Sequence, residues 1–299
     1  MDERAGNKKD RILMIGAHGM LGRPVARRLL ADGFSVRAMA RHPEKAKAVL
    51  PSSLDVVQGN LEDVGSMDRA LDGCHSAYLS VDTPPKARFH SETEGLKNLI
   101  KAARNHPDIR LFVLSALRSS DPGAKNHPWW HAREKFEAQQ IATSSGLAWT
   151  LFEPTWFMES LPLFIKGKNF YYVKCGLEAY WISGDDFGRI FSALLKKNIG
   201  QEEIVPIQGP EKYSLLTAAR RFIQAYDPAI KIRTVPAFVL TLAGLVQPQA
   251  KELATLLALS DEIKEEAPSP EIWERTAQPM MSFETYAYYV RRTNDFPQK

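Results

Sequence analysis

The chain has 299 residues and a formal net charge of +4, with 39 basic and 35 acidic side chains. These charges are interspersed, which gives no reason to propose a nucleic acid or a membrane as a partner. The distant cysteines Cys74 and Cys175 argue against a disulfide scaffold and a zinc site. The charged residues 1–10 are expected to form a flexible tail, and the apolar stretch 237–246 is too short to span a bilayer. We therefore expect a cytoplasmic protein without a metal.

The first predicted strand, residues 12–15, runs into three glycines spaced by two residues: Gly16, Gly19 and Gly22. A helical apolar pattern follows. In such a turn the first glycine permits the tight bend, the second lets the backbone approach a pyrophosphate, and the third lets the helix lie against the strand. An ordinary structural turn is the alternative, but the position between first strand and first helix favours dinucleotide binding. The predicted cofactor site also includes the intervening residues His18, Met20 and Leu21.

The second predicted strand, residues 34–40, ends at Arg41, before a helix that Pro43 opens. An NAD-preferring fold places a carboxylate there for the ribose hydroxyls, whereas an arginine accommodates a 2'-phosphate. Arg41 therefore predicts NADP(H) rather than NAD(H), the alternative being a solvated loop arginine. Arg23 and Arg37 are weaker candidates for the same role.

Three further predicted strands end at the edge where open α/β sheets bind ligands. Residues 54–58 lead into a turn whose Asn60 and Leu61 would border the adenine, and Asp63 would cap the next helix. The strand 76–81 places Ser80 beside the nucleotide crevice, and the strand 110–115 delivers Ser115 to the same edge. The alternation predicts a doubly wound, parallel Rossmann sheet.

The segment from Trp129 to about Gly146 predicts a helix on which His131 and Lys135 are four residues apart. That spacing puts both side chains on one face, where the ammonium group could lower the pKa of the imidazole and where both could surround a bound ribose. A histidine exchanges protons near neutral pH. The spacing by itself fits an ordinary surface pair better.

The sixth predicted strand, residues 147–152, precedes Pro154 and the aromatic residues Trp156 and Phe157. At the end of a sheet strand such rings either join the core or cover a nicotinamide and its substrate, and both interpretations stay open. We include Pro154 and Phe157 in the predicted cofactor site.

The alternation of strands and helices loosens beyond residue 155. We expect a nucleotide-binding domain over 11–155 and a smaller, mostly helical substrate or partner region over 156–299, with a soft boundary across which segments interleave. Asp185 or Asp186 would cap a helix that runs to Lys197, and an amphipathic helix would end at Tyr226. The helical stretch 236–263 would line a substrate cleft or an interface, such as that of a homodimer.

With these residues placed, the chain resembles the NmrA-like family of atypical short-chain dehydrogenase/reductase proteins, which bind NAD(P). The similarity covers nearly the whole chain and is specific only in combination. It rests on the glycine turn, Arg41 to Ala46, Gly59 to Asp63, Ser115, Lys135 with Glu137, Ser145 to Leu147, Pro154-x-x-Phe157-Met158-Glu159, Ile182-Ser183-x-Asp185-Asp186-x-Gly188 and Gly209 to Glu211.

Three positions depart from that family. Glu153 stands where it usually has arginine, and Asn60 where it commonly has aspartate. His131 replaces the tyrosine whose phenol protonates the substrate carbonyl in orthodox short-chain reductases. The same His-x-x-x-Lys arrangement occurs in NADPH-sensing relatives, so the resemblance leaves catalysis open.

Two functions follow. An NADPH-dependent reductase of a small carbonyl, quinone or enone would use Lys135 on the nicotinamide ribose, His131 as proton donor or orienting group, and Ser115 on the substrate oxygen. A non-catalytic sensor would instead regulate a protein partner when NADPH replaces NADP. A third, plainer option is an accessory protein that keeps a structural nucleotide.

Overall fold

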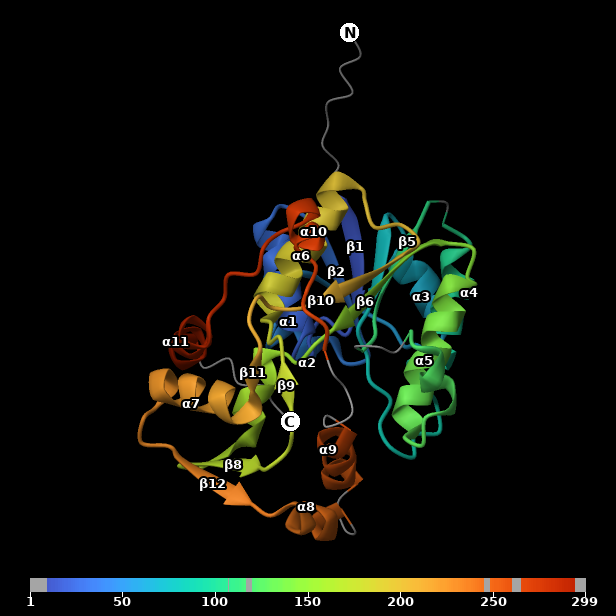
Figure 1. Cartoon of the computed structure of the whole chain (residues 1–299). Helices are drawn as coiled ribbons and strands as arrows, with labels where there is room; N and C mark the ends of the chain where they lie inside the picture. Colours follow the sequence, from blue (N-terminus) through green and yellow to red (C-terminus); the bar gives the residue numbers. More distant parts are fainter. Residues whose placement is uncertain (1–9, 107, 117–119, 245–247, 260–264, 294–299) are drawn as a thin grey trace.

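The computed structural model describes residues 10–106, 108–116, 120–244, 248–259 and 265–293, so the predicted tail over 1–10 lies outside it except for Asp10. Within this part of the chain, seven parallel strands form one sheet in the order β10-β6-β5-β4-β1-β2-β3 (Figure 1). The strands are β1 (Arg11–Ile15), β2 (Ser35–Ala40), β3 (Asp55–Gln58), β4 (Ser76–Leu79), β5 (Arg110–Leu114), β6 (Ala148–Pro154) and β10 (Glu203–Ile207). The order reverses between β1 and β4, which is the ligand-binding switch point of a doubly wound sheet.

Helices cover both faces of this sheet. On one face α1 packs against α6, and on the other α4 packs against α3 and α5 (Figure 1). These helices, with the short α2 and η1, are α1 (Gly22–Ala31), α2 (Pro43–Lys47), α3 (Val64–Leu71), α4 (Glu94–Ala103), η1 (Pro122–Asn126), α5 (Trp130–Thr143) and α6 (Gly184–Lys197). The predicted α/β Rossmann class is confirmed.

The central strand β1 shows why the sequence folds in this way. Ile12 and Met14 belong to the core beneath α1 and α6, while Leu13 and Ile15 belong to the core beneath α3, α4 and α5. All four side chains are buried. An apolar run without alternation is what a strand covered on both faces requires.

The C-terminal region builds a second unit from short strands and helices around its own core. One small sheet has the order β12-β8-β7 and the other pairs β11 with β9. These elements are η2 (Met158–Phe164), β7 (Ile165–Lys166), β8 (Asn169–Val173), β9 (Glu178–Ala179), β11 (Tyr213–Ser214), α7 (Leu215–Tyr226), β12 (Lys231–Val235), α8 (Ala237–Gly244), α9 (Pro248–Leu259) and α11 (Phe283–Thr293). Helix α10 (Pro270–Arg275) instead packs on the main sheet, where Ile272 joins the core beneath α1 and α6. No helix in the described residues is long and apolar enough to cross a bilayer.

Two predicted helix caps have different outcomes. Asp63 caps α3 as expected, because its Oδ1 accepts a hydrogen bond from the backbone of Gly65 at 2.9 Å. The prediction for α6 was wrong: Ser183 is the N-cap, and its Oγ accepts from the backbone of Asp186 at 3.0 Å. Asp185 is instead held by Arg28 of α1, at 2.8 Å.

The soft boundary near residue 155 is crossed by the fold. Strand β10 pairs with β6 in the main sheet, and α6 packs on α1, although both lie beyond that residue. Residues 184–207 therefore belong spatially to the nucleotide-binding layer.

Candidate functional site

The glycine turn is built so that side chains cannot enter it. Gly16 has a φ of +93°, and a Cβ atom added there would overlap the carbonyl oxygen of Ser80, at the end of β4. A Cβ atom on Gly22 would overlap the carbonyl oxygen of Gly16. The backbone of Gly19 donates to that same oxygen at 3.0 Å and closes the turn. The predicted roles of the first and third glycines therefore have a direct physical basis.

Helix α1 begins at the end of this turn without side-chain help. Its N-cap residue is Leu21, which makes no side-chain capping hydrogen bond. The first backbone N–H groups of a helix carry partial positive charge, and an anion at this end is stabilised by them. The turn and the helix together form the cradle that a pyrophosphate requires.

Basic side chains surround the turn. Partial desolvation lowers the pKa of His18, and the charges of Arg41 and Arg23 lower it further. Arg41 is exposed at the end of β2, as the 2'-phosphate hypothesis needs. Arg37 is not available for that role, because its guanidinium binds Asp55 at 2.7 Å and two backbone carbonyls.

The turn that was predicted to border the adenine is stabilised mainly by hydrogen bonds among its own residues. The Asn60 Oδ1 accepts from the backbone of Glu62 at 3.2 Å, and its N–H donates to Ser66. Leu61 is buried and its carbonyl accepts from Asn98. The backbone N–H group of Ser80 donates a hydrogen bond to the carbonyl oxygen of Ile15 at 3.0 Å.

A second cluster brings Lys135 and His131 of α5 to two carboxylates. The Lys135 ammonium group binds Glu92 Oε1, and His131 Nε2 lies 3.5 Å from Glu92 Oε2. His131 also donates to Asp82 at 2.9 Å. Desolvation acts to raise the pKa of Asp82, but the hydrogen bond from His131 and the charge of Lys135 outweigh it and hold that pKa below its usual value.

His131 is 9% exposed, so the interpretation of His131 and Lys135 as an ordinary surface pair was wrong. Glu92 lies between Lys135 and His131 as a shared partner. Trp129 stacks on the imidazole at 5.2 Å between ring centres, and Trp130 lies tilted at 4.9 Å. Both indole N–H groups donate to Glu252 of α9, at 2.6 and 3.1 Å. Helix α9 thereby fixes the wall of this cluster.

Ser115 lies in the same neighbourhood. It lines one small cavity with Glu92 and Lys135. Its Oγ accepts a hydrogen bond from Gln139 at 3.1 Å, and the same amide nitrogen donates to Glu153 at 2.8 Å. The buried Glu153, where the resembling family has arginine, thus has partners of its own.

The residues at and after the end of β6 are packed against other parts of the protein. Pro154 is the last residue of β6 and is buried. Phe157 is 6% exposed and packs against Phe187 in the core under α1, so its ring has the core role that the sequence left open. Trp156 packs against Trp181 at 5.9 Å.

Asp82, Glu92 and His131 also have the spacing of metal ligands, with one ligand atom each within 4.8 Å of the others. The sequence predicted no metal here. Lys135 already neutralises Glu92, and His131 already bonds to Asp82, so the cluster is self-sufficient as an ion-pair network. The two cysteines are free thiols, as expected.

Sequence reasoning missed the acidic partners Asp82, Glu92, Glu252 and Glu153. For Asp82 a signal was present, because it follows a buried strand at the ligand-binding edge. Glu92 and Glu252 lie 43 and 117 residues from Lys135 in the chain (135 − 92 and 252 − 135) and carry no motif that singles them out.

Comparison with known proteins adds sequence relatives. The (4-alkanoyl-5-oxo-2,5-dihydrofuran-3-yl)methyl phosphate reductase of Streptomyces griseus is 35% identical over 150 residues, which span 50% of this chain and only 49% of that protein. The NAD(P)H azoreductase of Xenophilus azovorans is 26% identical over 207 residues, 68% of this chain and 69% of its own.

Solved structures share the fold at low identity. An NADPH-dependent quinone oxidoreductase of Escherichia coli, in complex with NADPH, has a TM-score of 0.73 at 18% identity over 93% of this chain and 99% of its own. A mutant of NmrA has a TM-score of 0.68 at 18% identity, over 96% of this chain and 97% of its own. The predicted resemblance is confirmed at the level of fold.

The sequence profile of the NAD(P)H-binding family matches residues 16–166, about half of the chain, and begins at the first glycine of the turn described above. The chain therefore belongs to the NAD(P)H-binding family and shares the Rossmann fold of NmrA.

Proposed function

We propose that this protein is an NADPH-dependent reductase of a small carbonyl, quinone or enone compound. The observation that carries the proposal is the meeting of two clusters at one sheet edge. The glycine turn follows β1, Asp82 follows the neighbouring β4, and Ser115 follows β5. A nucleotide in the turn would direct its reactive end toward Lys135 and Ser115.

The turn fits the nucleotide, because Gly16 and Gly22 let the backbone fold tightly where a Cβ atom would overlap a carbonyl oxygen, and the first N–H groups of α1 have no side-chain cap. The residues that would hold it are Gly16, His18, Gly19, Met20, Leu21, Gly22, Arg41, Asn60, Leu61, Ser80, Lys135 and Pro154. When bound, NADPH supplies a hydride to the substrate.

The residues of the chain would control position and protons. Lys135 would hold the ribose hydroxyls, and Ser115, whose Oγ accepts a hydrogen bond from Gln139, would position the substrate oxygen by hydrogen bonding. His131 would supply the proton. Asp82, whose side chain is 73% exposed, lies 2.9 Å from His131 and would connect it to solvent. The two indoles would keep water from the imidazole.

NADP(H) is the preferred cofactor in this proposal. Arg41 stands at the end of β2 where an NAD-binding fold has a carboxylate. The charge of Arg41 acts on His18 of the glycine turn, which supports a phosphate reader over a solvated loop arginine. The activities that give the azoreductase and the quinone oxidoreductase their names are consistent with a small-molecule acceptor.

The test begins with titrations of NADPH, NADP, NADH and NAD against the full chain. An acceptor panel of quinones, enones and aldehydes then follows NADPH oxidation. We expect His131→Asn to lower kcat about 100-fold with unchanged NADPH affinity, and Lys135→Met to weaken NADPH binding. Tight NADPH binding with no oxidation above background across the panel would refute the reductase.

One observation favours a second function, a NADPH sensor that regulates a protein partner. His131 replaces the tyrosine of orthodox reductases, and its imidazole is engaged by Asp82. In this case NADPH and NADP would give different oligomeric states or partner affinities. Identical sedimentation profiles and partner binding with the two nucleotides would exclude it.

A further inference from the structure

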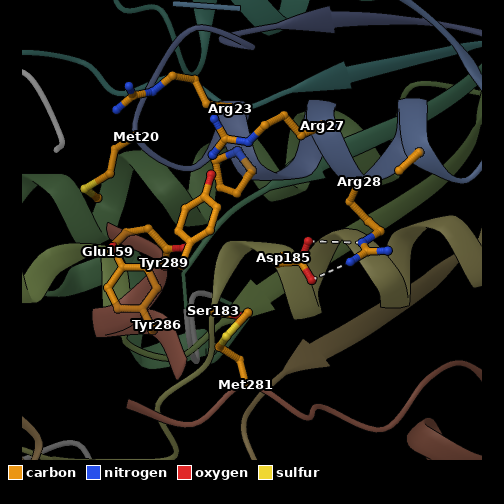
Figure 2. Close-up of a pocket in the computed structure, with 12 residues that line it drawn as sticks. Met20, Arg23, Arg27, Arg28, Glu159, Ser183, Asp185, Met281, Tyr286 and Tyr289 are labelled. Carbon is orange, nitrogen blue, oxygen red and sulfur yellow. Dashed lines mark hydrogen bonds and ion pairs between the residues drawn. The ribbon is translucent and has the colours of Figure 1, made fainter. Parts of the chain in front are cut away.

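A second cavity lies beside α1, on the face of the sheet that α6 covers. It has a volume of about 370 Å³ and receives side chains from α1, η2, the start of α6 and α11 (Figure 2). None of Ser115, His131 and Lys135 lines it. Met20 and Arg23 link its upper end to the glycine turn, but its walls continue along the length of α1.

Glu159 gives this cavity an unsatisfied acceptor. The residue is 7% exposed, and its Oε1 accepts from the backbone of Gly184 at 2.9 Å. Its Oε2 is buried and has no hydrogen-bond partner among the described residues. A buried carboxylate oxygen without a donor is costly, so a ligand that supplies an N–H group would be stabilised there.

Cationic and aromatic side chains form part of the remaining lining, beside apolar ones. Arg23 and Arg27 of α1 border the cavity, and the charge of Arg27 acts on Glu159 without replacing the missing hydrogen bond. The Arg27 guanidinium lies 5.7 Å from the ring centre of Tyr289, and Tyr286 is on the same face of α11 (Figure 2). Arg28 is different, because its guanidinium donates two hydrogen bonds to Asp185 and also lies 3.8 Å from Asp32.

We propose that this cavity binds a small aromatic acid that also carries an N–H donor, of the aminobenzoate kind. The donor would meet Glu159, the flat ring would lie against Tyr286 and Tyr289, and the acid group would be attracted by Arg23 and Arg27. The volume is in the range of small-molecule sites and exceeds what one aromatic ring needs. The cavity meets the proposed nucleotide site only at Met20, and none of Ser115, His131 and Lys135 lines it, so the proposal does not depend on the reductase hypothesis.

The test uses the full chain at pH 8, above the pKa of about 7 of Glu159, so that its carboxyl group is mostly ionised. Three probes are titrated by calorimetry or saturation transfer. 4-Aminobenzoate has both groups, benzoate lacks the donor, and aniline lacks the acid. We expect 4-aminobenzoate to bind saturably and each truncated probe to bind about tenfold more weakly, the loss of one charge-assisted interaction. Saturating NADPH should leave this binding unchanged.

The Glu159→Gln variant should change which probe binds more tightly, rather than only weaken binding. The Gly184 N–H requires an acceptor, so the glutamine oxygen stays on it and the NH₂ group turns into the cavity. The preference should therefore invert, with 4-nitrobenzoate, an acceptor, binding more tightly than 4-aminobenzoate. Arg27→Met should weaken both acids and leave aniline unchanged. NADPH titration of each variant verifies that it is folded.

Three outcomes would overturn the proposal. The first is absence of saturable 4-aminobenzoate binding to the wild-type chain. The second is equal affinity for 4-aminobenzoate and benzoate, which would mean that Glu159 does not read a donor. The third is competition by NADPH, which would place the probe in the nucleotide crevice.

Discussion

The carboxylate of Glu92 binds the ammonium group of Lys135, the residue that the nucleotide proposal assigns to the ribose. Both side chains are largely buried, with 6% and 16% of their surface exposed. A nucleotide bound through Lys135 would therefore compete with Glu92 for its ammonium group. We expect this ion pair to affect nucleotide affinity whether or not the protein catalyses a reaction.

Glu92→Gln removes the competing charge. We expect NADPH affinity to rise about fivefold, since about 1 kcal/mol of ion pairing is released toward the nucleotide. The free energy of unfolding should fall by about 1 kcal/mol, because Glu92 Oε2 also accepts from Thr83. Glu137→Gln is the control, as its partner Lys97 forms an exposed pair. Weaker NADPH binding in a folded Glu92→Gln chain would mean that Glu92 positions the lysine.

Arg41→Ala should separate the two cofactors. Loss of a charged contact to a 2'-phosphate weakens NADPH by about 10- to 100-fold and leaves NADH nearly unchanged. Calorimetric titration with each nucleotide measures the ratio. Lys47→Ala, which removes a nearby surface charge paired with Glu44, should change neither affinity. Equal losses for both nucleotides in Arg41→Ala would show that Arg41 does not read the phosphate.

Gly16→Ala should abolish nucleotide binding and destabilise the fold by about 2–5 kcal/mol, because left-handed strain and overlap with Ser80 add together. Gly33→Ala is a matched control: its φ is +94°, but nothing lies within 4 Å of an added Cβ atom. That variant should lose only about 1–2 kcal/mol and keep NADPH affinity. Urea denaturation reports both values, and equal losses would mean that crowding at the turn is unimportant.

Glu159 should make the stability depend on pH. Burial raises its pKa from an ordinary 4.5 to about 7, so the folded chain binds a proton that the unfolded chain releases between these values. This contribution is fully present below pH 4.5 and is lost as pH rises through 7. It amounts to about 3 kcal/mol. Urea midpoints at pH 4.5 and 8 should differ less in Glu159→Gln than in wild type, and the same pH dependence in both chains would contradict the assignment.

The sequence predicted best where local rules and the fold agree. The glycine turn, the Asp63 cap and the end of α7 at Tyr226 depend on residues close together in the chain. The α6 cap failed for a tertiary reason. Arg28 of α1 draws Asp185 away, and Asp186 accepts from the backbones of Met280 and Met281.

The sequence predicted only part of the candidate site. The positions of His131 and Lys135 on one helix face followed from their spacing, but their partners did not. Glu92 precedes α4, and Glu252 lies on α9, so only the folded chain brings both to α5. Phe157 shows the same limit, because strand-end position cannot tell whether a ring faces a ligand or the core.

The position of β10 has a consequence for how the chain is made. β10 pairs with β6 over five residues, and the loop before it is tied to β6 through Thr150, whose hydroxyl donates to Gly200 at 2.6 Å. When only the first 155 residues have left the ribosome, β6 is therefore an edge strand with unpaired backbone groups. Phe152 of this strand, which is buried in the folded chain, would then lack part of its cover. A nascent or truncated chain that stops there is expected to aggregate, and the nucleotide-binding layer closes only after residue 207 has emerged.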